Sequence, residues 1–363
     1  MSEGVYDELR KLLDCHPVGC ESTPEILQIL KILFTDEEAK VALGLGFIPF
    51  TVEDIARRAG VEPTEAQEKL ESLAQKGYVF ARKKDGVWGY ALQNAVVLFE
   101  MLYRKGLRED IPDGLTALWE KHHTNTARNT QTKTPMFRVI PVQKKIVHSP
   151  EVLPYSKVEE MIDNAKVLGI THCACREFSQ NCDAPRETCM QFDTTCTFMV
   201  ERGFGRYITK EEMKEKLVEF DKLGLFRQVN NTTNRLEFIC NCCPCCCLVL
   251  RKMMEFKNPY AFIRSPFIPV LDETKCDGCA ICADERCPTK AIEMVDNKPI
   301  LEIERCIGCG LCASGCPTDA WRMEKLIEVP EALANTTEWG MKVLQERGKL
   351  EAFMKTMSTA NKR

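Results

Sequence analysis

The sequence has no long hydrophobic run and none of the short motifs that mark a nucleotide-dependent enzyme. No stretch of about 18 apolar residues occurs, so we expect no transmembrane helix. The first residues, MSEGVYDELRKLLDCHPVG, lack the basic region and apolar core of a signal peptide. A glycine-rich nucleotide-binding motif, a flavin fingerprint and a catalytic triad are also missing. These absences predict a cytoplasmic protein that needs a partner to perform chemistry.

Basic residues are too few to make nucleic acid a general partner. Lys and Arg number 49 against 53 Asp and Glu, which gives a formal net charge of −4. A chain of this sign repels phosphates more than it attracts them. Hydrophobic residues at 44% and charged residues at 28% are ordinary for a globular protein. The length of 363 residues predicts two or three domains.

Cysteine is the residue in excess. The chain has 21 cysteines, and 19 of them fall between Cys173 and Cys316. In a small secreted chain such a number would indicate disulfides. In a long cytosolic chain thiols stay reduced, so the same number indicates bound metal.

Two cysteine runs in the last quarter of the chain share one spacing. The first is Cys276-x2-Cys279-x2-Cys282-x4-Cys287-Pro288, and the second is Cys306-x2-Cys309-x2-Cys312-x3-Cys316-Pro317. Two residues between cysteines let one tight loop present three thiolates to three irons of a cube. Over about residues 266–325 the chain resembles a bacterial-type ferredoxin that carries two [4Fe–4S] clusters.

This resemblance implies that each cluster takes its fourth ligand from the other run. One predicted set is Cys276, Cys279, Cys282 and Cys316, and the other is Cys306, Cys309, Cys312 and Cys287. A pair of zinc knuckles is the alternative, because Cys-x2-Cys also suits tetrahedral zinc. Two cross-paired sets, with each run ending in Cys-Pro, favour iron and sulfide. The first run has one residue more than the family pattern before its last cysteine, which a loop should tolerate. Strands at 291–295 and 298–303 should cover the clusters.

A second group of cysteines precedes the ferredoxin-like segment. Cys173-Ala174-Cys175-Arg176 is followed by Cys182, Cys189 and Cys196, and the stretch 240–247 places six cysteines in eight positions. Crowded thiolates repel one another unless a cation neutralises them, so at least one further metal centre is expected. The candidate ligands are Cys173, Cys175, Cys182, Cys189, Cys240, Cys242, Cys243, Cys245, Cys246 and Cys247.

The sequence leaves the arrangement of this central site open. One [4Fe–4S] cluster could draw ligands from both halves. Alternatively, one centre could form on Cys173, Cys175, Cys182 and Cys189 and another on the six-cysteine run. Structural zinc is the main rival to iron. His172 is as well suited to a supporting role as to ligation, and Arg176 could donate hydrogen bonds to cluster sulfurs.

The first third of the chain predicts a winged-helix-like domain. Helices at 52–59 and from Pro63 to Gly77 precede strands at 78–82 and 87–91, which flank an Asp85-Gly86 turn. The second helix is acidic, which argues against DNA binding. His122 and His123 are expected to be solvated rather than to bind metal, and Cys15 and Cys20 to be plain small residues. A second helix-and-hairpin unit is possible at 210–239.

The fold class expected is α+β, with a winged-helix-like domain, a cysteine-rich α+β domain, a two-[4Fe–4S] ferredoxin domain and a helical tail. The predicted domains are 1–123, a linker at 124–150, 151–265, 266–325 and 326–363. The chain as a whole resembles the multidomain ferredoxin-like iron–sulfur proteins of anaerobes. That resemblance implies relay of single electrons through two [4Fe–4S] clusters, and one or two more, to a partner oxidoreductase. The alternatives are a redox-sensing transcription regulator and an enzyme subunit whose central cluster binds substrate.

Overall fold

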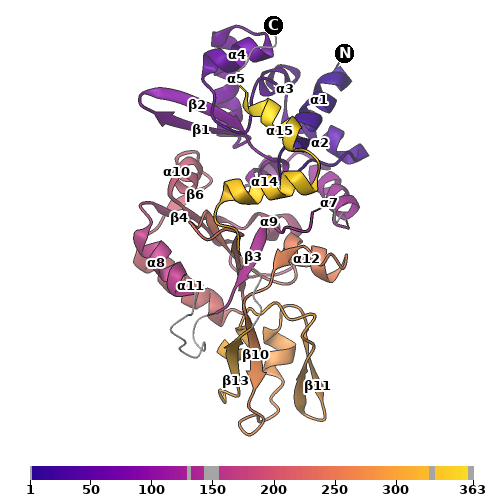
Figure 1. The fold of residues 1–363 in the computed structure, drawn as a ribbon, viewed down its shortest axis with the longest axis vertical. Coiled ribbons are helices and arrows are strands. Elements are labelled where there is room, and N and C mark those ends of the chain that lie inside the picture. The colour runs from indigo at the N-terminus through magenta and orange to yellow at the C-terminus, as the bar shows by residue number, and fades with distance from the viewer. Residues whose placement is uncertain (1, 129–131, 143–154, 327–331, 359–363) are drawn as a thin grey trace. The chain divides into compact units, whose positions relative to one another are not determined.

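The computed structural model describes residues 2–128, 132–142, 155–326 and 332–358 (Figure 1). The chain forms two compact units, each with its own core. The first comprises Met1–Thr134, Phe198–Phe204 and Gly340–Arg363, and the second comprises Pro135–Thr197 and Gly205–Trp339. Parts of the expected linker (129–131 and 143–150), of the expected cysteine-rich domain (151–154) and of the expected tail (327–331 and 359–363) lie outside the described residues.

The first unit is a helical domain with one hairpin. Its elements are α1 (Ser2–Asp14), α2 (Pro24–Leu33), α3 (Asp36–Ala42), α4 (Val52–Ala59), α5 (Pro63–Gln75), β1 (Val79–Lys84), β2 (Val87–Leu92), α6 (Ala95–Arg104), the short helix η1 (Arg108–Asp110), α7 (Leu115–Thr126) and α15 (Leu350–Met357). The Thr51 hydroxyl caps α4, and Gly60 ends it in a left-handed conformation. Asp85 and Gly86 both have positive φ, the geometry of a type I′ hairpin turn. The predicted order of two helices and a hairpin is therefore present.

The second unit is built on a seven-stranded sheet with the order β6-β4-β5-β8-β7-β3-β9. All pairs are antiparallel except β3 with β9. The strands are β3 (Phe137–Ile140), β4 (Leu168–His172), β5 (Glu187–Phe192), β6 (Gly205–Tyr207), β7 (Phe226–Asn230), β8 (Phe238–Cys242) and β9 (Phe262–Ile263). β3 falls inside the segment expected to be a linker, because only residues 124–134 have a linker's polar composition. β8 extends beyond the helix-and-hairpin unit expected at 210–239, so that the strand itself carries Cys240 and Cys242.

Alternation along the strands gives the sheet two different faces. On one face Ile170, Met190 and Ile239 pack with α8 (Tyr155–Asn164) and α11 (Lys210–Lys222). On the other, Val139 and Phe226 pack with α12 (Leu248–Met254) and with loops of the ferredoxin-like segment. In Figure 1, α8 and α11 lie to the left of β3 and α12 lies to its right. α9 (Ala174–Ser179) also belongs to this unit, whereas α10 (Asp193–Glu201) and α14 (Thr336–Glu346) each have residues in both units.

The ferredoxin-like segment contributes two small antiparallel sheets. The predicted one pairs β11 (Ile292–Val295) with β12 (Lys298–Leu301). A second sheet, which the sequence did not predict, pairs β10 (Phe267–Leu271) with β13 (Trp321–Lys325). In the chain, a short helix, α13 (Leu311–Ser314), lies between β12 and β13. No helix in the described part of the chain is long and apolar enough to cross a membrane.

Candidate metal centres

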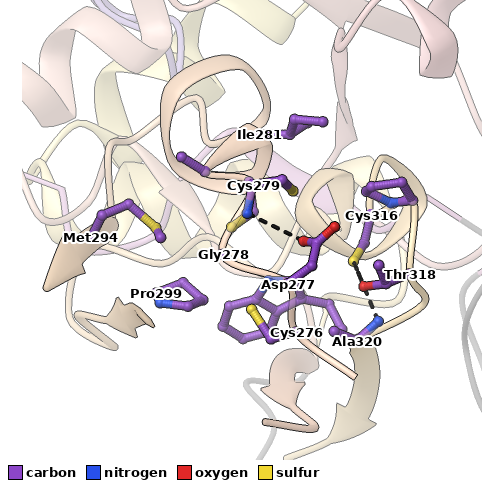
Figure 2. Close-up of a pocket in the computed structure, with 14 residues that line it drawn as sticks. Cys276, Asp277, Gly278, Cys279, Ile281, Met294, Pro299, Cys316, Thr318 and Ala320 are labelled. Carbon is purple, nitrogen blue, oxygen red and sulfur yellow. Dashed lines mark hydrogen bonds between the residues drawn. The ribbon is translucent and has the colours of Figure 1, made fainter. Parts of the chain in front are cut away.

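The first cysteine run surrounds a hollow of about 300 Å³, counting the space open to solvent (Figure 2). Four cysteines line it: Cys276, Cys279, Cys282 and Cys316. The loop turns back because Gly278 and Ala280 have positive φ and the Asp277 carboxylate accepts the backbone N–H of Cys279 at 3.2 Å. Three thiols of one run thus face the fourth cysteine of the other run.

The second hollow, of about 290 Å³, has the complementary set of cysteines: Cys287, Cys306, Cys309 and Cys312. The backbone N–H of Ala291 donates to Cys287 Sγ at 3.1 Å. A Cβ on Gly308 would lie 2.2 Å from the carbonyl oxygen of Phe267, so only glycine fits in this loop. Both predicted sets are therefore brought together, each around its own cavity.

Hydrogen-bond donors around Cys316 favour the thiolate form that binds a metal. Burial opposes ionisation of Cys316, but the Thr318 hydroxyl and the N–H groups of Ala320 and Trp321 lower the pKa of Cys316 below its ordinary value. The Ala320 N–H lies 3.3 Å from Cys316 Sγ. The hollows, the thiol sets and these donors all fit iron–sulfur cubes held by thiolates.

The extra residue between Cys282 and Cys287 is accommodated by a π-helical turn at Cys282–Arg286. Such a turn absorbs one residue without displacing its flanking positions. It also points Arg286 at backbone carbonyl groups elsewhere in the second unit. The Arg286 guanidinium donates to Leu311 at 3.2 Å, to Asp221 at 2.7 Å and to Lys222 at 3.0 Å. The latter two carbonyls end α11, where a cation is favourable.

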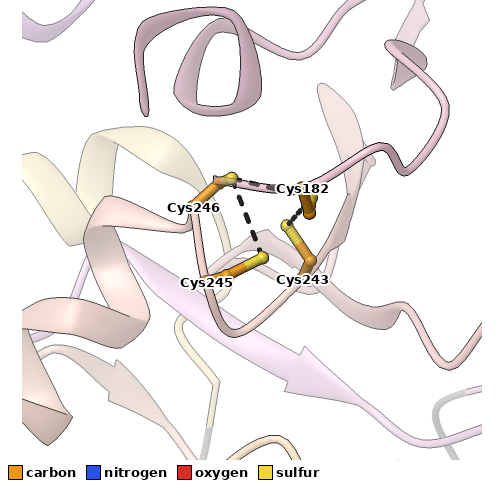
Figure 3. A group of neighbouring side chains, drawn as sticks. All are labelled: Cys182, Cys243, Cys245 and Cys246. Atoms are coloured by element: carbon orange, nitrogen blue, oxygen red, sulfur yellow. Dashed lines mark hydrogen bonds between the residues drawn. The ribbon is translucent and has the colours of Figure 1, made fainter. Parts of the chain in front are cut away.

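Four of the ten central cysteines form a compact group, here called the four-thiol group: Cys182, Cys243, Cys245 and Cys246 (Figure 3). Their sulfurs all lie within 4.8 Å of one another. Sγ of Cys182 is 3.7 Å from Cys243 and 3.7 Å from Cys246, and Sγ of Cys246 is 3.8 Å from Cys245. Cys182 follows α9, whereas the other three occupy the turn between β8 and α12. The side chain of Asn181 donates to the Cys245 carbonyl at 2.9 Å and ties the two segments together.

Arg176 lies beside this group and is completely buried. Its Nε donates to Cys243 Sγ at 3.4 Å, and its other nitrogens donate to Thr188 Oγ1 at 2.8 Å and to the carbonyls of Asn241 (3.0 Å) and Pro185. A hydrogen bond from Cys246 and the positive charge of Arg176 lower the pKa of Cys243, although burial opposes this. A fully buried guanidinium therefore has a cysteine sulfur of this group among its hydrogen-bond acceptors.

The other six central cysteines form a second set, here called the six-thiol ring: Cys173, Cys175, Cys189, Cys240, Cys242 and Cys247. Neighbouring thiols interact in the pairs 173 with 175, 173 with 189, 242 with 240, and 242 with 247. Cys175 and Cys247 are electrostatic neighbours, and Cys189 is opposite Cys240 in the β5–β8 ladder. These six neighbour relations trace a ring of thiols that draws on both halves of the central sequence.

Gln228, on β7, supports the ring and was not predicted from the sequence. The side chain is 3% exposed, and its Nε2 lies 3.4 Å from Cys242 Sγ and 3.6 Å from Cys247 Sγ. Gln228 is opposite Cys240 in the β7–β8 ladder. Its role could therefore have been predicted only from the pairing of these two strands. Backbone N–H groups at the start of α12 donate to Cys247 and, together with a hydrogen bond from Cys242, lower the pKa of Cys247.

Other residues considered from the sequence lie outside both groups. Burial raises the pKa of Cys196 to about 12, as for a core residue. Cys20 is likewise buried. His122 is not solvated as expected: it is 7% exposed, and its Nδ1 lies 2.9 Å from Thr23 Oγ1, because α7 packs against α2. His172 contacts Glu177, with 2.9 Å between Nδ1 and Oε1.

Comparison with known proteins agrees with the geometry of the two hollows. A family model described as a 4Fe-4S dicluster domain matches residues 275–320, which contain both cysteine runs. No curated protein and no solved structure matches the chain. The chain is thus an iron–sulfur protein with a ferredoxin-type dicluster domain.

Proposed function

We propose that this protein relays single electrons through the two ferredoxin clusters and a further iron–sulfur cluster in the six-thiol ring to a partner oxidoreductase. The observation on which the proposal rests is the continuous apolar packing between the second ferredoxin hollow and the six-thiol ring. Cys309, from the second ferredoxin hollow, belongs to the same buried apolar cluster as Cys242 and Cys247 of the ring.

The first step of the relay joins the two ferredoxin hollows. Cys282 lines one and Cys312 lines the other, and both belong to one apolar cluster with Phe267, Trp321 and Met323. Electron transfer between buried clusters requires short, well-packed separations, because the electron tunnels through the intervening atoms. Close packing of ligands from both sets meets this requirement.

The second step joins the ferredoxin domain to the ring. Phe226 and Leu311, both fully buried, belong to the same apolar cluster as Cys309 and the ring cysteines Cys242 and Cys247. The backbone N–H of Val142 donates to the Cys309 carbonyl at 2.8 Å, which fixes the loop against the sheet. The four-thiol group belongs to the apolar cluster on the other face of the sheet. The ring is therefore the central site that continues the path.

Exposure suggests where an electron enters. Cys279 of the first hollow is exposed, whereas Cys309 and Cys312 of the second are buried. An external donor or acceptor would thus exchange with the first cluster, and the ring would be the inner end. We propose a cytoplasmic location in an anaerobe, since this many metal-bound thiolates need reducing conditions.

The helical first unit is proposed to be winged-helix-like and to dock protein rather than DNA. The exposed surface of α5 carries Glu62, Glu68 and Glu71. Carboxylates at these positions repel a phosphate backbone. A gel-shift assay at low salt would show no sequence-dependent complex, and a tight one would favour the redox-sensing regulator instead.

The proposal is tested on protein purified without oxygen, by iron and sulfide analysis and by EPR of the reduced state. Two cubes account for eight irons, and a third would bring the total to about twelve, with sulfide in equal number. In a Cys240→Ala, Cys242→Ala double variant the extra irons and their EPR signal should be lost while the ferredoxin signals remain. Wild-type protein with eight irons and no further cluster signal would contradict the relay.

A further inference from the structure

We infer that the four-thiol group holds a single tetrahedral metal ion, Zn²⁺ or a mononuclear iron, and not an iron–sulfur cube. Its members are Cys182, Cys243, Cys245 and Cys246. This assignment goes beyond the proposed relay and does not depend on it.

Sulfur spacing is the first argument. A metal–sulfur distance of about 2.3 Å places the corners of a tetrahedron about 3.8 Å apart. The three shortest contacts of the group are 3.7, 3.7 and 3.8 Å. In a cube each thiolate binds a different iron, so the irons and their sulfides hold the thiolates farther apart. A single ion fits three of the spacings as they stand, and the remaining pairs, all within 4.8 Å, would have to close by about 1 Å or less.

The ferredoxin cysteines of the same chain provide an internal comparison. Their two sets of four surround hollows of about 300 and 290 Å³. The four-thiol group instead closes on itself, with every sulfur within 4.8 Å of the others (Figure 3). Two kinds of tetrathiolate site are thus present, one with room for a cube and one with room for an ion.

Charge is the second, independent argument. Arg176 is completely buried, and no carboxylate in the described part of the chain forms an ion pair with it. A buried cation without an anion is strongly unfavourable. Arg176 Nε donates to Cys243 Sγ at 3.4 Å, so the guanidinium contacts a member of the four-thiol group. Four thiolates around a divalent ion carry a net charge of about −2, which Arg176 partly neutralises.

The ion would cross-link two segments that also carry ring cysteines. Cys182 follows the helix that contains Cys175, and Cys243 and Cys246 adjoin Cys242 and Cys247. Fixing the turn after β8 therefore fixes where the ring thiols are presented. Structural zinc sites stabilise folds in this way.

Metal and sulfide counts test the assignment. Anaerobically purified wild-type protein is compared with Cys245→Ser and with Cys15→Ser, a control whose thiol lies outside both groups. We expect Cys245→Ser to lose one ion per chain, as zinc or as iron in excess of sulfide, with sulfide unchanged and the control equal to wild type. Loss of about four irons together with four sulfides would establish a cube and overturn the inference. Unchanged metal content would overturn it as well.

X-ray absorption on the wild-type protein keeps the test decisive if the variant does not fold. At the zinc edge a single shell of four sulfurs at about 2.3 Å is expected. If the ion is iron, zinc is absent and iron exceeds sulfide by one per chain. Wild-type protein with no zinc and with equal iron and sulfide would refute the single-ion site. None of these readouts depends on electron transfer, so the proposed relay and the proposed single-ion site can be refuted independently.

Discussion

The buried Arg176 offers the sharpest test of how the four-thiol group is held together. We consider Arg176→Met, which keeps the length of the side chain and removes its charge, and Arg176→Lys, which keeps the charge and loses the fork of donors. Arg176 Nε lies 3.4 Å from Cys243 Sγ. Both variants leave the four thiols in place, so any change in metal binding reports on the guanidinium.

The magnitude follows from charge and distance. Two unit charges 3.4 Å apart interact by about 5 kcal/mol at an effective dielectric constant of about 20. Each thiolate of a divalent tetrathiolate keeps about half a charge, which reduces the interaction to about 2.5 kcal/mol. Arg176→Met should therefore weaken ion binding by about 50- to 100-fold. Arg176→Lys should lose about tenfold, because an ammonium group cannot satisfy the carbonyl of Asn241 and the hydroxyl of Thr188 together.

The assay is competition between the protein and a chromophoric chelator under anaerobic conditions, with ion release followed by absorbance. Chemical denaturation of the metal-free variants measures the cost of the unsatisfied carbonyls separately. Equal retention of the ion by wild type and Arg176→Met, within twofold, would refute the charge argument. Equal weakening by both variants would show that hydrogen-bond geometry, and not charge, is responsible.

Three further predictions concern the clusters. Gln228→Leu removes the N–H donors to two ring thiols. For hydrogen bonds of about 1 kcal/mol each, this loss should lower the reduction potential of the proposed ring cluster by about 40–80 mV. An EPR-monitored redox titration measures the potential, and an unchanged value would contradict the prediction. Arg286→Ala should lower the free energy of unfolding by about 1–3 kcal/mol in anaerobic denaturation, since four hydrogen bonds are lost. Gly308→Ala should cost the second cluster its iron because its Cβ would meet the Phe267 carbonyl, whereas Gly60→Ala, at similar φ but in open space, should retain all iron.

The ferredoxin hollows were predictable because their information is local. Spacing of two residues between cysteines dictates one loop with three of the thiols, and the resemblance to bacterial-type ferredoxins supplies the fourth ligand from the other run. The hairpins followed for the same reason, since turn residues such as Asp85-Gly86 act over four positions. The π-helical turn before Cys287 was not predictable: the extra residue is visible in the sequence, but its conformation depends on where Arg286 finds its acceptors.

The division of the central cysteines could not be predicted, because it depends on a sheet. β5 pairs with β8 across about fifty residues, which brings Cys189 opposite Cys240. Cysteines adjacent in sequence then belong to different faces: Cys242 lies with the ring, and Cys243 lies with the four-thiol group. Of the two arrangements expected from the sequence, the two-centre one kept the six-cysteine run together, and the one-cluster one left open which of its cysteines bind. Periodicity of two along β8 separates them instead.

This separation makes the order of assembly matter. Before β8 pairs with β5, the six thiols of the stretch 240–247 are not yet divided between the ring and the four-thiol group. Zinc binds thiolate-rich segments tightly and without sulfide, so it would compete for the thiols of the proposed ring cluster. Once the sheet has formed, Cys242 and Cys247 of the ring lie on one of its faces and the four-thiol group lies on the other. Correct metal loading of this protein therefore depends on folding, because β5 must pair with β8 before the central thiols bind their metals.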